Sequence, residues 1–182
     1  MGIPTLITTN TTASNVTEMD FSSGITSAYD EYMFVFTNID HAGSEVDFQF
    51  QVNATDDDGG DYDVSLITST HFYASKLEAD SATYDRLVYT TGHDLAQSAS
   101  FQNLGFDSSN GADDNYDGIM HLFNPASTTF VKHFYSRVLT SGVARDHFVA
   151  GYINDTTAID DIRFKMSDGG NFIGTIQMYG IS

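Results

Sequence analysis

Apolar and polar residues alternate most regularly in the segment 31–53, EYMFVFTNIDHAGSEVDFQFQVN. From Val46 to Val52 every second side chain is apolar and the residues between are polar, which is typical of an antiparallel strand with one buried face. Residues 32–37 are largely apolar on both faces, so we expect a strand that is covered on both sides or lies at a subunit contact. The short link at 41–44 contains a glycine and predicts that the two strands form a β-hairpin.

The rest of the chain is a series of short β-like segments separated by polar turns. A turn is expected at 10–15, and the one helical turn that the pattern allows is at 74–80. About ten to twelve strands with almost no helix predict an all-β fold, a two-sheet antiparallel sandwich that is jelly-roll-like, with residues 1–182 as a single domain. Besides the two strands of the hairpin, we expect strands at 3–9, 16–21, 64–72, 87–90, 99–106, 119–123, 128–140, 148–153, 158–166 and 173–179.

Charge and cysteine content exclude several classes of partner and chemistry. The chain has 25 acidic and 7 basic residues, for a net charge of −18. A surface this acidic repels phosphate groups, so we expect binding neither to nucleic acid nor to anionic membranes. Cysteine is absent, which excludes disulfides, thiolate metal sites and cysteine nucleophiles.

One acidic segment resembles the first half of a calcium-binding loop. Asp113, Asn115 and Asp117 are followed by Gly118 in the pattern D-x-[DN]-x-[DN]-G, which places oxygen ligands at alternate positions. The bidentate glutamate at the twelfth position is missing, because Asn124 stands there. The alternative interpretation is a solvated acidic turn between strands, and we expect no required cofactor. The acidic glycine loop at 56–61 is a weaker candidate of the same kind.

No motif of an enzyme is present in the sequence, and we expect no catalytic residues. The six histidines lack metal-like spacing, and neither G-x-S-x-G nor a phosphate-binding glycine loop occurs. Asp160 and Asp161 are neighbours on an expected strand, so they point to opposite faces and cannot flank one glycosidic bond. A sugar-binding platform is a further hypothesis, resting on aromatic side chains that lie close together in the sequence: His71, Phe72, Tyr73, Tyr84 and Tyr89.

Short motifs at both ends and in the middle of the chain resemble one family of proteins. They are Thr12-Ala13-Ser14-Asn15, Phe21, Gly24-Ile25, Tyr29-Asp30, Tyr32, Phe34, Phe36, Asn38-Ile39, the segment 122–129 (LFNPASTT), the segment 158–164 (AIDDIRF), Ser167, Gly170, Gly174-Thr175-Ile176 and Tyr179-Gly180-Ile181. The pattern is similar to small virion structural proteins of tailed bacteriophages from marine and fresh water. The resemblance implies a β-sandwich building block of the particle and carries no catalytic residues to transfer.

Together these observations predict a non-enzymatic virion protein, either a tail or fibre component or a capsid decoration, that acts by self-assembly and attachment to the particle. Its expected partners are other virion proteins and further copies of itself in a closed homo-oligomer, which by analogy with the family is a trimer. The alternative is a carbohydrate-binding module or adhesin that recognises host surface glycans, with calcium assisting. A glycan-cleaving enzyme is a third class.

Overall fold

The computed structural model describes residues 2–41, 43, 45–55, 62, 64–79, 82–108, 111 and 113–182. This part of the chain is almost entirely β-structure, as the sequence predicts, and contains no helix of the length and apolar character that crossing a bilayer requires. The elements are β1 (Thr5–Val16), β2 (Glu18–Phe21), β3 (Glu31–His41), β4 (Val46–Ala54), β5 (Ile67–Leu77), the 3-10 turn η1 (Ala82–Tyr84), β6 (Arg86–Tyr89), β7 (Gln102–Ser108), β8 (Tyr116–Phe123), β9 (Lys132–Thr140), β10 (Val143–Ile153), β11 (Ile159–Met166) and β12 (Phe172–Ile181).

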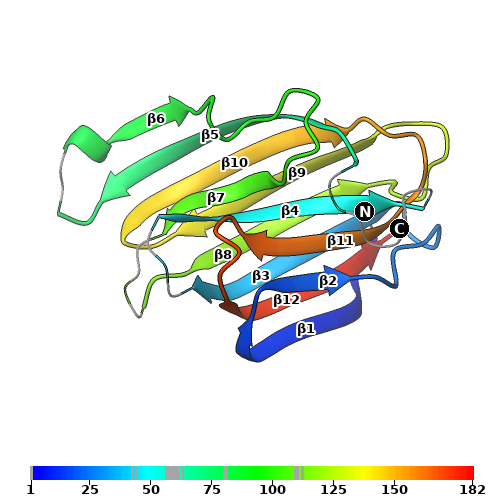
Figure 1. Cartoon of the computed structure of the whole chain (residues 1–182), viewed down its shortest axis with the longest axis horizontal. Helices are drawn as coiled ribbons and strands as arrows, with labels where there is room; N and C mark the ends of the chain where they lie inside the picture. Colours follow the sequence, from blue (N-terminus) through cyan, green and yellow to red (C-terminus); the bar gives the residue numbers. More distant parts are fainter. Residues whose placement is uncertain are drawn as a thin grey trace.

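The strands form two antiparallel sheets that pack face to face (Figure 1). The large sheet has eight strands in the order β1-β12-β3-β8-β9-β10-β5-β6, and the small sheet has four in the order β2-β11-β4-β7. In Figure 1 the small sheet lies across the large one, and β5 and β6 extend beyond it. The large sheet therefore has an inner face toward the small sheet and an outer face on the opposite side.

The strand order is that of a jelly roll with two insertions. The insertions are β5–β6 and β9–β10. Among the other eight strands, β1 pairs with β12, β2 with β11, β3 with β8, and β4 with β7. The first and third of these pairs lie in the large sheet, and the second and fourth lie in the small sheet. Such a nested antiparallel ribbon is the eight-stranded jelly-roll arrangement. The four inserted strands then extend the large sheet beyond β8. The predicted jelly-roll-like sandwich is confirmed.

The hairpin predicted for the segment 31–53 is wrong, although both of its strands form. β3 pairs with β12 and β8 in the large sheet, whereas β4 pairs with β11 and β7 in the small sheet. Phe36 of β3 and Phe48 of β4 meet across the interior instead, with ring centroids 5.1 Å apart. Two strands that each present one aromatic face can remove both faces from water by packing them against each other, whereas a hairpin would need a further element to cover both.

The interior consists of the alternate side chains that the two sheets direct toward each other. Phe48 and Phe50 are fully buried, as the period of two in β4 predicts. Phe164 of β11 joins this cluster, with its ring centroid 5.3 Å from that of Phe36 and 5.9 Å from that of Phe48. Aromatic pairs of this kind contribute about 0.5–1.5 kcal/mol each beyond the burial of their surface.

Two further sequence predictions fail at element boundaries. The predicted helical turn at 74–80 is strand up to Leu77, because β5 continues its pairing with β10 as far as Val143. The predicted turn at 10–15 lies inside β1, whose residues Thr9 to Thr12 pair with β12. In both places a long neighbouring strand offers backbone partners, and this pairing overrides the local preference of the side chains.

Candidate functional site

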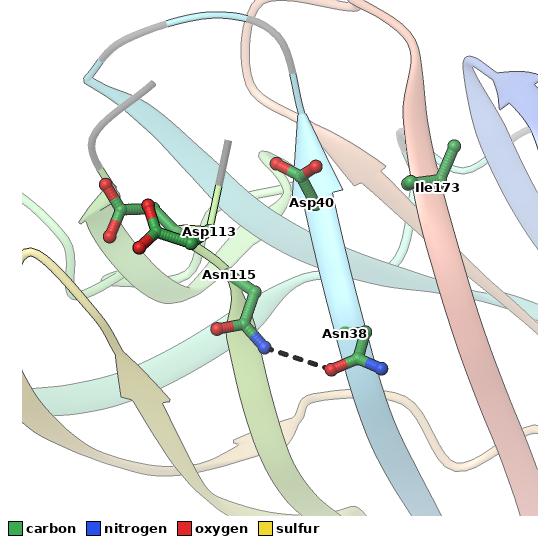
Figure 2. A pocket seen from close by; sticks show the side chains of 6 residues that line it. Asn38, Asp40, Asp113, Asn115 and Ile173 are labelled. Carbon is green, nitrogen blue, oxygen red and sulfur yellow. Dashed lines mark hydrogen bonds between the residues drawn. The ribbon is translucent and has the colours of Figure 1, made fainter. Parts of the chain in front are cut away.

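The segment proposed to bind calcium borders an acidic pocket at one end of the neighbouring strands β12, β3 and β8 of the large sheet (Figure 2). The pocket has a volume of about 310 Å³. Figure 2 shows that its side chains come from β3, from β12 and from the residues before β8. The lining residues are Asn38, Asp40, Asp113, Asp114, Asn115 and Ile173.

A β-bulge in β3 shapes this pocket. The pairing of β3 with β8 shifts between Phe36 and Ile39, and Asn38 takes a φ of 52°. On the other side of β3, a Cβ atom on Gly174 would lie 2.6 Å from the carbonyl oxygen of Asn38. Gly174 also has a φ of 135°, so this position requires glycine for both conformation and space.

Asp117 stabilises the bulge and does not line the pocket. It lies within β8, and its Oδ1 accepts a hydrogen bond of 2.8 Å from the backbone N–H of Asn38. Its Oδ2 accepts a hydrogen bond from the side-chain amide of Asn115. Both carboxylate oxygens therefore already accept hydrogen bonds from neutral donors, one of them a backbone amide that the bulge releases from the ladder.

Of the three residues of the proposed calcium site, Asn115 contacts Asp117 through a hydrogen bond and shares the pocket with Asp113, but Asp117 does not line the pocket. Asp113 and Asn115 line the pocket, whereas Asp117 faces Asn38, and Gly118 lies in the paired part of β8 and not at a turn. Asp40 also lines the pocket, although it is distant in the sequence from the other acidic residues. No sequence pattern around Asp40 indicated a binding site. Among the described residues, no three carboxylates or histidines are placed to hold a metal ion. The weaker candidate loop at 56–61 lies outside the described residues.

The outer face of the large sheet is a second candidate, because no strand of the small sheet packs on it. One row of paired residues crosses seven strands of this face, from β12 to β6. Aliphatic and aromatic side chains predominate in the row. In order it consists of Gln177, Val35, Ile119, Arg137, Phe148, Phe72 and Tyr89.

The strongest apolar exposure on this face is at the corner formed by β9, β10, β5 and β6. We call it the aromatic corner and define it as Phe72, Leu87, Tyr89, Leu139 and Phe148. Leu87 is 72% exposed and Tyr89 is 55% exposed. The rings of Phe72 and Phe148 are parallel, with centroids 4.9 Å apart. Exposed apolar side chains that adjoin one another in this way mark binding surfaces more often than isolated ones do.

Charges at the aromatic corner are paired, in contrast to the acidic character of the whole chain. Arg137 binds Asp146 through two hydrogen bonds of 2.8 and 2.7 Å. Lys76 binds Asp85 at 2.9 Å. A second protein surface can therefore approach this corner with less electrostatic repulsion than the net charge of −18 would suggest.

The five aromatic residues proposed as a sugar-binding platform do not share one surface. His71 and Tyr73 are buried on the inner face of β5, whereas Phe72 lies between them on the outer face. Phe72 pairs with Tyr89 across β5 and β6, so these two residues remain available on the aromatic corner.

Three histidines that are far apart in the sequence meet inside the sandwich. The Nε2 atom of His71 lies 3.2 Å from the Nδ1 atom of His147, and both residues are fully buried. His93 stacks on Phe106, with ring centroids 4.2 Å apart, and its Nδ1 atom lies 3.6 Å from a carboxylate oxygen of Asp47. Sequence spacing gave no signal for this cluster, because β5, β7 and β10 come together only in the folded chain.

Burial controls the protonation of the two innermost histidines. It lowers the pKa of His71 to about 4, with a further contribution from the nearby His93. Burial also lowers the pKa of His147 to about 2, and the positive potentials of His71 and Arg145 act in the same direction. Both imidazoles are therefore neutral at pH 7, and one donates a hydrogen bond to the other.

The chain matches no protein-family model, no curated protein and no solved structure.

Proposed function

We propose that the protein is a non-enzymatic structural protein of a bacteriophage virion, either a tail or fibre component or a capsid decoration, which acts by self-assembly and attachment to the particle. The resemblance of its motifs to phage virion proteins and the jelly-roll order of its strands support this proposal. The observation that carries the assembly step is the aromatic corner, where exposed apolar side chains lie among paired charges.

Self-assembly through the aromatic corner has to overcome repulsion between copies that each carry a charge of −18. Salt screens this repulsion, with a Debye length of about 10 Å at 0.1 M ionic strength, but does not weaken apolar contact. Association should therefore strengthen as salt is added. A closed trimer, the expected state, requires a heterologous contact in which the corner of one copy meets a different surface of the next.

The test is light scattering coupled to size exclusion, at micromolar protein and at low and high salt. We expect a discrete oligomer whose population rises with salt. The double substitution Leu87→Ser and Tyr89→Ser should reduce it to monomer. Phe130→Ser is the matched control, because Phe130 is 68% exposed but lies outside the corner. A monomer under both salt conditions would contradict self-assembly, and failure of antibodies to label purified virions would contradict the virion assignment.

A second candidate function is carbohydrate binding, favoured by the exposed pair Phe72 and Tyr89. Aromatic rings pack against the C–H faces of sugar rings, and this pair lies on an open surface. A glycan array distinguishes the two candidates. Binding of a host surface glycan that is lost in Tyr89→Ala, by a protein that remains monomeric, would favour an adhesin.

A further inference from the structure

The outer face also contains a hollow that lies outside the aromatic corner. Its volume is about 440 Å³, and the N-terminal residues Gly2 and Pro4 form one of its walls. The other side chains come from β3, β8, β9 and β12. They are Glu31, Met33, His121, Phe123, Tyr135 and Ile181.

Strand register brings the rings in this hollow together. Met33, His121 and Tyr135 are directly paired neighbours on β3, β8 and β9, and Glu31 pairs with Phe123 in the adjoining row. The ring centroids of His121 and Tyr135 are 4.7 Å apart, and those of Phe123 and Tyr135 are 5.7 Å apart. Tyr135 remains 42% exposed, so part of its ring is accessible to a ligand.

A single carboxylate accompanies these rings. The Oε1 atom of Glu31 forms a hydrogen bond with Nδ1 of His121, which holds the carboxylate beside the aromatic group. In the described part of the chain no hydrogen bond reaches the second oxygen, Oε2. The carboxylate is therefore fixed in place and can still accept a hydrogen bond or attract a positive charge.

We propose that this hollow binds an organic ammonium group, such as a quaternary trimethylammonium. Aromatic rings attract cations through their electron-rich faces, and a neighbouring carboxylate adds direct charge attraction. The net charge of −18 raises the local concentration of any cation near the surface. A neutral sugar would gain from the rings but not from the charge, so the combination favours a cation. This inference goes beyond the proposed virion role and does not depend on it.

Choline and its uncharged carbon isostere, 3,3-dimethylbutan-1-ol, form a matched pair of probes. They have nearly the same shape and differ in the positive charge. Titration of each into the full-length protein, followed by nuclear magnetic resonance, measures both affinities. We expect choline to bind about tenfold or more tightly than the isostere, because cation–π and carboxylate attraction act only on choline.

Two substitutions assign the binding to the hollow. Glu31→Gln keeps an acceptor for His121 and removes the charge, so it should lower the preference for choline, while the attraction of the rings remains. Tyr135→Leu removes an exposed ring and should weaken choline binding by about tenfold. Tyr89→Leu is the control, because Tyr89 is an even more exposed tyrosine at the aromatic corner, and it should leave choline binding unchanged.

Several outcomes would overturn the proposal. These are equal affinity for the two probes, no choline binding at millimolar concentration, and a preference for choline that Glu31→Gln leaves unchanged. Binding of a neutral glycan in this hollow, with no response to choline, would also overturn it. Because all variants are tested for a folded one-dimensional proton spectrum first, loss of binding cannot be confused with unfolding.

Discussion

The Nε2 atom of His71 and the Nδ1 atom of His147 face each other 3.2 Å apart, on neighbouring strands in the interior of the sandwich. Two neutral imidazoles can share one proton at this distance, but two protonated ones would place donor against donor. The charged and titratable groups that face the pair are Arg145 on β10, Tyr73 on β5, His93 and Asp94 after β6 and, beyond His93, Asp47 on β4. The folded state therefore favours the neutral pair.

This pair should make the protein sensitive to mild acid. The pKa of both histidines is lowered in the folded state, so below about pH 6.5 the unfolded chain binds more protons than the folded one. The contribution of the neutral pair to the free energy of unfolding is fully present above pH 6.5. It is lost as the pH falls, by up to about 1.4 kcal/mol per pH unit for each histidine. Urea unfolding followed by circular dichroism between about pH 7 and about pH 5 measures the slope of the free energy of unfolding against pH.

The matched variants for the acid effect are His147→Gln and His133→Gln. His147→Gln removes one buried titrating group and should reduce the slope to about half. His133 is exposed on β9, so His133→Gln should keep the slope of the wild type. Equal slopes for His147→Gln and the wild type would show that the buried pair does not control the response to acid.

The aromatic interior should depend strongly on Phe50. Its side chain is fully buried, and its ring centroid lies 5.0 Å from that of Phe134 in the large sheet. Phe50→Ala leaves a cavity between the sheets and should lower the free energy of unfolding by ~3–5 kcal/mol. Phe130→Ala, at a ring that is mostly exposed, should change it by less than about 0.5 kcal/mol. Similar urea midpoints for the two variants would contradict the assignment of the interior.

Much of this fold could be predicted from the sequence because its strands alternate cleanly. The period of two in β4 identified Phe48 and Phe50 as buried, and it did so without knowledge of any partner strand. The placement of β3 and β4 in opposite sheets could not be predicted in this way. A period of two fixes which face of a strand is buried, but it does not distinguish a neighbour in the same sheet from one in the opposite sheet.

The surface sites were less accessible to sequence reasoning. Residues 32–37 were expected to be covered on both sides or to lie at a subunit contact. The small sheet covers one face only, and Met33 and Val35 lie on the outer face, so the subunit contact stays a prediction. The aromatic corner and the hollow combine residues from four strands each, so they exist only once the register of the large sheet is set. No local sequence motif predicts that register.

Asp117 should contribute to stability through the bulge and not through calcium. Asp117→Ala removes the acceptor for the backbone N–H of Asn38 and should cost about 1 kcal/mol. Asp113→Ala, at an exposed position, should cost less than about 0.5 kcal/mol. Neither EDTA nor added calcium should shift the melting temperature of these proteins or the wild type. A calcium-dependent rise in melting temperature that Asp117→Ala abolishes would contradict this prediction.

The close approach of β8 to β9 should make Gly118 irreplaceable. Gly118 pairs with Val138, and a Cβ atom on it would lie 2.3 Å from the carbonyl oxygen of Arg137 and 2.8 Å from the Cα atom of Val138. These are backbone atoms held by the sheet, so they cannot move aside as a side chain can. Gly118→Ala should therefore lower the free energy of unfolding by ~1–3 kcal/mol, as overpacking does elsewhere.

Gly92 provides the control for Gly118, because no atom lies within 4 Å of a Cβ atom placed on it. Gly92→Ala should leave the stability unchanged or raise it by up to about 1 kcal/mol, since alanine restricts the unfolded chain. If urea unfolding gave the same midpoint for Gly118→Ala as for the wild type, β8 and β9 would not be paired as described. The hollow depends on the same pairing, because it places His121 of β8 beside Tyr135 of β9, so that result would also remove the basis for the proposed ammonium site.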